Sequence, residues 1–373
     1  MKKTNPTLSA PSFRLRFLLL SAAFIIIFIS SFLLGRYAIG FSDFFKIIFS
    51  QFSKGFAAIA SADRCPDMLS GVFQSISEHT EIKQTWDSAA EVVLFNIRIP
   101  RIIAAAIIGA ALSVAGVSYQ GMFRNPMVSP DILGASSGAG FGAALGILMS
   151  FGYFGITISA FLFGITAVLL AYFISRVSRM EGTLAMILAG MIISSLFSSC
   201  TSFIKLIADT EDELPAITYW LMGSLTSIKV TDTIFVIIPV IIGMIPLVLL
   251  RWRLNLLTVS EEEAKSLGIN TTALRLVIIV CATLMTSASV AVSGMIGWVG
   301  LVIPHFCRII FGYDYRRLIP STALFGASFL MLVDNLSRNL TTSEIPIGIL
   351  TSFVGAPVFL YLIMTGRKSD GDY

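Results

Sequence analysis

The side chains that could perform acid–base, metal or nucleotide chemistry in this chain are few. Its two histidines, His79 and His305, lie far apart and outside any spacing that binds zinc. The four cysteines are also widely separated, so they indicate neither a disulfide framework nor a metal motif. The chain has no Gly-x-x-x-x-Gly-Lys-Ser/Thr sequence that could hold nucleotide phosphates. We therefore predict no catalytic residue and no metal or cofactor bound by this chain.

Ionisable residues inside apolar stretches would mark an ion or proton pathway in a membrane protein. Asp131, Arg308 and Asp334 lie toward the ends of such stretches, and the middles are uncharged. Asp334 can pair with Arg338 one helical turn later. This pattern disfavours a proton-coupled carrier and predicts that a partner supplies the energy for transport. A secondary carrier built on broken helices and backbone carbonyls stays an alternative.

One acidic sequence has the signals of a short helix. In Ser260-Glu261-Glu262-Glu263, the Ser260 hydroxyl can accept from the Glu263 amide while the Glu263 side chain reaches back, which is a capping box. Acids favour the first turn of a helix, and Gly268 supplies a C-terminal stop. We expect a rigid helix that presents a docking surface, with a solvated loop as the alternative.

The elements that must position these residues are long apolar segments. Hydrophobic residues make up 55% of the chain and charged residues 13%, about half the charge of a soluble domain. A helix of about 20 apolar residues crosses a bilayer, and lipid excludes open sheets. The sequence therefore predicts an all-α polytopic membrane protein. The ten expected spans are 17–34, 102–120, 132–150, 156–175, 184–206, 233–250, 274–292, 298–311, 319–336 and 346–365.

Positive charge gives the expected orientation. Short loops at one side carry Arg176 and Arg179, Arg251 and Arg253, and the pair at 316–317. Because cytoplasmic loops are enriched in Lys and Arg, these loops and both termini are predicted to be cytoplasmic. The net charge of +4 then reflects topology and not a nucleic-acid surface. We expect one transmembrane domain over 1–373, with an extracytoplasmic segment at about 41–97 and a cytoplasmic loop at about 251–274 that contains the acidic helix.

The extracytoplasmic segment begins with an amphipathic pattern. Apolar residues recur near helical spacing from Phe41 to Ile59, and Lys46, Ser50 and Ser53 lie mostly opposite. This favours a helix lying in the outer membrane interface. We prefer a role in capping the spans to a dedicated ligand site.

Several short motifs follow one another along the chain in a recognisable order. They are Arg98-Ile-Pro-Arg101, Gln120-Gly-Met-Phe-Arg-Asn-Pro126, Ser129-Pro-Asp-Ile-Leu-Gly134, Tyr219-Trp-Leu-Met-Gly223, Ser260–Gly268, Gly297–His305 and Glu344-Ile-Pro-Ile-Gly348. With these motifs the chain resembles the permease family of type II ABC importers, which carry iron–siderophore complexes, haem and cobalamin.

The resemblance implies a set of partners and a mechanism. Two permease subunits, by default a homodimer, would surround one pathway in the bacterial inner membrane. Two separate ATPase subunits would bind ATP and Mg, and an extracytoplasmic binding protein would deliver the substrate. The chain would then import by alternating access without hydrolysing ATP itself. A structural membrane subunit that moves nothing remains a further alternative, and no motif names the cargo.

The resemblance also assigns residues to roles. Ser260, Glu261, Glu262, Glu263, Ala264, Leu267 and Gly268 would form the coupling helix that fits a cleft of the ATPase. Exposed Arg98, Arg101 and Arg338 would dock glutamates of the binding protein, whereas without the family they would be expected to reach lipid headgroups. Gly182, Thr183 and Leu184 on the inner side, with Trp220, Met222 and Gly223 further out, would line or gate the pathway.

Overall fold

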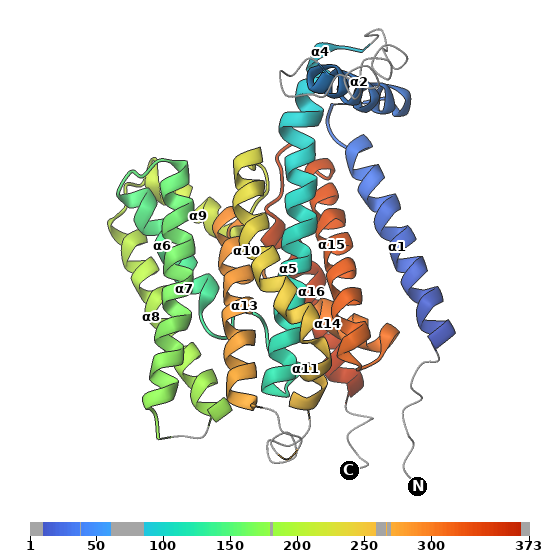
Figure 1. Cartoon of the computed structure of the whole chain (residues 1–373). Coiled ribbons are helices and arrows are strands. Elements are labelled where there is room, and N and C mark those ends of the chain that lie inside the picture. Colours follow the sequence, from blue (N-terminus) through green and yellow to red (C-terminus); the bar gives the residue numbers. More distant parts are fainter. Residues whose placement is uncertain are drawn as a thin grey trace.

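The computed structural model describes residues 10–37, 39–60, 86–179, 182–258, 266 and 270–366. These ranges are mainly helical and contain no strand (Figure 1), so the predicted all-α class is confirmed. The helices are α1 (Ala10–Leu33), α2 (Phe41–Ala60), α4 (Ser88–Val92), the π-helical η1 (Val93–Arg98), α5 (Ile99–Phe123), α6 (Ala135–Leu148), α7 (Tyr153–Val177), α8 (Gly182–Ile207), α9 (Glu213–Met222), α10 (Val230–Leu249), α11 (Arg251–Leu257), α13 (Thr271–Ser293), α14 (Val299–Phe311), α15 (Tyr315–Asn339) and α16 (Ile347–Gly366).

Each of the ten predicted spans coincides with a helix. Within the described ranges, seven helices are long and apolar enough to cross a membrane, and α4, η1 and α5 form one of them, Ser88–Phe123. The apolar stretches of α6, α14 and α16 are shorter. The chain is therefore a multi-pass membrane protein. The start of α1 and the end of α16 lie at the same end of the bundle (Figure 1).

Helix α5 occupies the centre of the bundle and packs through glycines. A Cβ atom on Gly109 would collide with the carbonyl of Gly326 in α15, and one on Gly116 would collide with the carbonyl of Gly300 in α14. Small residues let membrane helices approach until their backbones touch. The backbones of α14 and α15 are thereby fixed against α5, which carries Arg101 near its outer end and begins directly after Arg98 at the end of η1.

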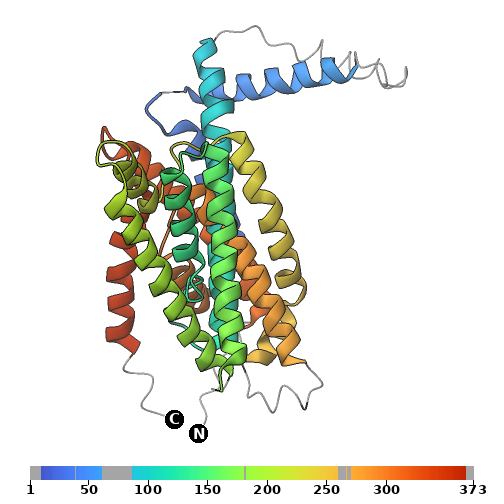
Figure 2. The same cartoon turned by 90° about the vertical axis from the view of Figure 1, so that its left-hand side faces the viewer.

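Helix α2 lies across the outer end of the bundle, roughly perpendicular to α5 (Figures 1 and 2). The predicted helix is confirmed, with Ser50 and Ser53 buried against the chain and Phe41 and Phe45 exposed on the other side. The buried side packs on the end of α1, where the ring of buried Phe44 lies 5.3 Å from that of Phe32. The rest of the predicted extracytoplasmic segment, at 61–85, lies outside the described residues.

Candidate functional site

The predicted coupling helix lies outside the described residues except for Ser266, so its capping box stays a prediction. The structure does describe both of its flanks. Helix α11 ends at Leu257 before this segment, and Asn270 caps α13 after it by accepting from the Ala273 amide at 2.9 Å. A force applied to the segment would therefore reach α11 and α13 first.

Helix α11 is fastened to two central helices at the inner end of the bundle. The Asn255 side chain donates to Asp314 at 2.8 Å and accepts from the Tyr315 amide at 2.9 Å, which joins α11 to the start of α15. Arg124, just after α5, donates from Nε to the Leu257 carbonyl at 2.8 Å. These bonds give a rigid path from the predicted coupling segment to α5 and α15.

The three predicted docking arginines lie at the outer end of the bundle, but they are buried. Arg98 and Arg101 are 3% exposed and Arg338 is 7% exposed, so the expectation that they are exposed is wrong. Each guanidinium has partners within the chain. Arg98 donates to the carbonyls of Phe32 and Tyr37, which holds the end of α1 against η1.

Arg101 and Arg338 share one carboxylate, Asp334, on α15. Arg101 donates from Nε to Asp334 at 2.8 Å, and Arg338 lies 3.1 Å from the other oxygen of Asp334. The predicted pairing of Asp334 with Arg338 is therefore confirmed. Glu344, in the loop between α15 and α16, lies 2.8 Å from Arg101 and accepts from Thr226 at 2.8 Å. Two cations and two anions thus balance within one outer ion cluster, which we define as Arg101, Asp334, Arg338 and Glu344.

The electrostatics of Glu344 follow from its place in this cluster. Partial burial alone would raise its pKa, but the hydrogen bond and the positive charge of Arg101 outweigh burial and lower the pKa below its ordinary value. The carboxylate therefore stays ionised and holds its loop on α5. A docking role for Arg98, Arg101 and Arg338 stays a prediction, and their burial gives them a structural task in this conformation.

The outer pathway residues Trp220, Met222 and Gly223 close a junction of three helices. Gly223 follows α9 with φ of +73°, and a Cβ there would lie 2.5 Å from the Met295 carbonyl after α13. Its own carbonyl accepts from the Ile347 amide of α16 at 2.9 Å. Trp220 is partly buried and Met222 is 39% exposed. The junction therefore ties α9 to α13 and α16, and of the three residues Met222 is the most exposed.

Helix α8 begins at Gly182, and its outward face combines apolar and polar residues. Leu184 is 54% exposed near its start. Further along, four serines recur at helical spacing on the exposed side, and we call them the serine face: Ser195, Ser198, Ser199 and Ser202. The Ser202 hydroxyl donates to the Ser198 carbonyl at 3.0 Å, which satisfies its donor inside an apolar helix. Sequence analysis missed these residues, although their spacing of three and four is visible in the sequence.

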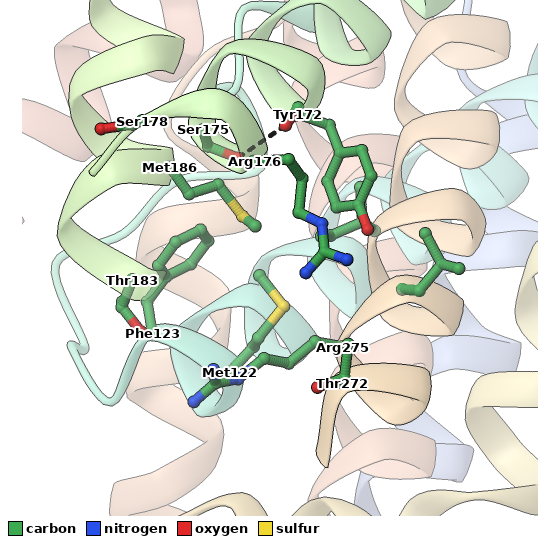
Figure 3. Close-up of a pocket in the computed structure, with 12 residues that line it drawn as sticks. Met122, Phe123, Tyr172, Ser175, Arg176, Ser178, Thr183, Met186, Thr272 and Arg275 are labelled. Carbon is green, nitrogen blue, oxygen red and sulfur yellow. Dashed lines mark hydrogen bonds between the residues drawn. The ribbon is translucent and has the colours of Figure 1, made fainter. Parts of the chain in front are cut away.

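Thr183 faces a different space, a cavity of about 230 Å³ at the inner end of the bundle. Figure 3 shows its side chain at the rim of this cavity, across from Arg275, with Arg176 reaching into the middle. The predicted inner gate residues are thus divided, because Thr183 faces this cavity while Leu184 is exposed on the surface of α8.

Comparison with known proteins decides the family. The model of the FecCD transport family matches residues 23–365, nearly the whole chain. The chain belongs to the FecCD transport family. The resemblance predicted from the motifs is confirmed, and the chain is a permease subunit of the ABC-importer type.

Individual members of the family agree with this assignment. The chain is 43% identical over 277 residues to a molybdate import system permease protein of Haemophilus influenzae, covering 74% of this chain and 82% of that protein. It is 41% identical over 280 residues to an iron chelatin transport system permease protein of Helicobacter pylori, covering 75% and 85%. A solved metal-chelate type ABC transporter in an inward-facing conformation matches with a TM-score of 0.78 at 36% identity, covering 94% of this FecCD chain and 99% of that one.

Proposed function

We propose that this FecCD permease is one of two subunits that surround a transport pathway in a bacterial inner membrane. The pair would move a metal-containing complex inward by alternating access. Two ATPase subunits would bind ATP and Mg at its cytoplasmic side, and an extracytoplasmic binding protein would deliver the cargo. The chain itself would carry out no hydrolysis. We take the homodimer as the default, because closed symmetric assemblies of identical subunits are the commonest kind among soluble oligomers.

The observation that carries this proposal is the serine face of α8. Lipid offers a hydroxyl group no hydrogen-bond partner, so a serine on a lipid-facing side can be satisfied only by its own helix, as Ser202 is by the Ser198 carbonyl. Four serines on one exposed side of a spanning helix therefore support a water-filled path or a second polar helix beside Ser199. Hydroxyl groups without charges also suit a bulky cargo that must pass without being held.

The attachment of α11 supports an ATP-driven cycle. A partner that pushes on the segment before Asn270 would move α11, and Asn255 would transfer that motion to α15. Because α15 is closely packed on α5 at Gly109, both central helices would move together. The charge-free middles of the spans favour the same conclusion, since a gradient-driven carrier usually needs intramembrane ionisable groups.

The outer ion cluster supports an indirect part in delivery. Arg101 forms an ion pair with Glu344, and Glu344 accepts a hydrogen bond from Thr226 in the loop between α9 and α10. We infer that the cluster fixes the shape of the outer loops that a binding protein would meet. Arg98 would do the same for the connection from α1 to α2, through its bonds to Phe32 and Tyr37.

An iron chelate is the proposed cargo, with haem and cobalamin as members of the same class of bulky metal complexes. The relative from Helicobacter pylori is named for an iron chelatin, and the solved neighbour is of the metal-chelate type. Molybdate is the second candidate, because the relative from Haemophilus influenzae is named for molybdate import.

The test is ATP hydrolysis by the complete assembly in lipid nanodiscs. The permease is purified with its ATPase and presented with the binding protein loaded in turn with a ferric siderophore, haem, cobalamin or molybdate. We expect one loaded form to stimulate hydrolysis several-fold over the empty binding protein. Equal hydrolysis with all loaded forms and with the empty form would contradict the proposal.

A further inference from the structure

A cavity and a groove meet between α7 and α13 at the inner end of the bundle. The cavity of about 230 Å³ is the one shown in Figure 3, and the groove beside it has about 130 Å³. Both are lined by Tyr172, Leu276 and Ile279. Because these residues line both hollows, the cavity and the groove are adjacent, and we describe them together as one depression.

The two ends of this depression differ in chemistry. The cavity holds two arginines, Arg176 on α7 and Arg275 on α13, whose side chains extend into the same space (Figure 3). Hydroxyl side chains add to its polar lining: Ser175, Ser178, Thr183 and Thr272. The cavity therefore presents positive charge and hydrogen-bond donors at the predicted cytoplasmic surface.

The groove, in contrast, is lined almost wholly by aliphatic side chains. Leu169 on α7 and Val280 on α13 form its two rims and are 59% and 54% exposed. Since both helices span the membrane, the groove runs from the arginines toward the bilayer interior. It opens sideways and is not a closed pore.

We propose that this depression binds an anionic phospholipid of the cytoplasmic leaflet. Its phosphate would lie between Arg176 and Arg275, and one acyl chain would lie in the groove along Leu276 and Val280. Basic pockets between membrane helices on the cytoplasmic side suit acidic headgroups. A guanidinium also carries five donors, so Arg275 can keep a protein partner and still donate to a phosphate oxygen.

Charge complementarity decides the class of lipid. A phosphodiester carries one negative charge, and a zwitterionic lipid would bring its ammonium group close to two guanidinium groups. Like charges at short range oppose binding. A free cytosolic anion such as inorganic phosphate would contact the arginines but would gain nothing from the apolar groove. The groove therefore favours a lipid over inorganic phosphate as the occupant.

The experiment is native mass spectrometry of the full chain in detergent with phosphatidylglycerol or phosphatidylcholine of the same acyl composition. We expect phosphatidylglycerol to bind more tightly. Arg176→Gln should weaken it about fivefold, as expected for one arginine near a headgroup. Arg179→Gln is the matched control, because Arg179 lies three residues later, is exposed and does not line the cavity.

The groove is tested separately by filling it. Val280→Trp should reduce phosphatidylglycerol binding, whereas Leu162→Trp, at an equally exposed position outside the groove, should not. Inorganic phosphate at the same concentration should not displace the lipid. Equal binding of the two lipids, equal loss in Arg176→Gln and Arg179→Gln, or displacement by phosphate with no effect of Val280→Trp would each overturn the proposal.

Discussion

Arg101 and Asp334 lie 2.8 Å apart at the outer end of the bundle although 233 residues separate them in the chain. The side chains are 3% and 1% exposed, so both charged groups are buried away from water. A buried ion pair offsets its desolvation only when its geometry and additional hydrogen bonds are complete. Glu344 and Arg338 complete this pair, and together they join α5, α15 and the loop that follows α15.

Removing Asp334 should destabilise the fold strongly. Asp334→Ala leaves two buried arginines, Arg101 and Arg338, with Glu344 as the one remaining carboxylate of the outer ion cluster. Breaking a buried ion pair lowers the free energy of unfolding by about 3–5 kcal/mol. Unfolding by SDS titration in mixed micelles measures the loss. Asp43→Ala is the control, because its 3.8 Å pair with Lys46 is exposed and should contribute about 1 kcal/mol or less. An equal effect of the two substitutions would contradict the outer ion cluster as a stabilising unit.

The contribution of Glu344 should depend on pH in one direction. Its pKa is lower in the folded chain than the ordinary value of about 4.3 for an unfolded chain. Such a group stabilises the fold fully above the unfolded pKa, and the stabilisation is lost as pH falls through the folded pKa. Wild type should therefore melt at a higher temperature than Glu344→Gln at pH 7, and the difference should shrink below about pH 4. A difference that grows on acidification would refute this account.

The spans were predictable from the sequence because bilayer thickness sets their length, and each predicted stretch coincides with a helix. The environment of Arg98, Arg101 and Arg338 was not predictable in the same way. The bond from Arg101 to Asp334 depends on α5 and α15 packing through Gly109 and Gly326, which no local pattern encodes. The contact of Phe44 in α2 with Phe32 in α1 is likewise a tertiary contact that no local pattern encodes.

The coupling route predicts a variant that separates ATP hydrolysis from transport. Asn255→Ala removes both bonds from α11 to the start of α15 but leaves the predicted coupling segment unchanged. The assembly should keep its ATPase subunits and hydrolyse ATP, yet import fewer molecules of cargo for each ATP. Uptake and hydrolysis measured in the same proteoliposomes give this ratio. Arg253→Ala, at an exposed position on the same helix, should leave it unchanged, and an unchanged ratio in Asn255→Ala would exclude the route.

The serine face predicts a difference between two neighbouring positions on α8. Ser199→Cys should react with a membrane-impermeant thiol reagent in the assembled transporter, in a background with the four native cysteines replaced by alanine. Leu196→Cys is the control, because Leu196 is 54% exposed but does not belong to the serine face. Equal labelling of both positions, or of neither, would argue against a polar path along Ser199.

The central claim is that this FecCD permease moves cargo only when a separate ATPase drives it. The most direct measurement is uptake of a radiolabelled ferric siderophore, and of molybdate in parallel, into proteoliposomes that contain the permease with or without its ATPase and loaded binding protein. The account predicts uptake of one cargo only when ATP is supplied on the side of the membrane that carries the ATPase. Collapsing the proton and sodium gradients should leave this uptake unchanged. Uptake by the permease alone that follows an ion gradient would contradict it.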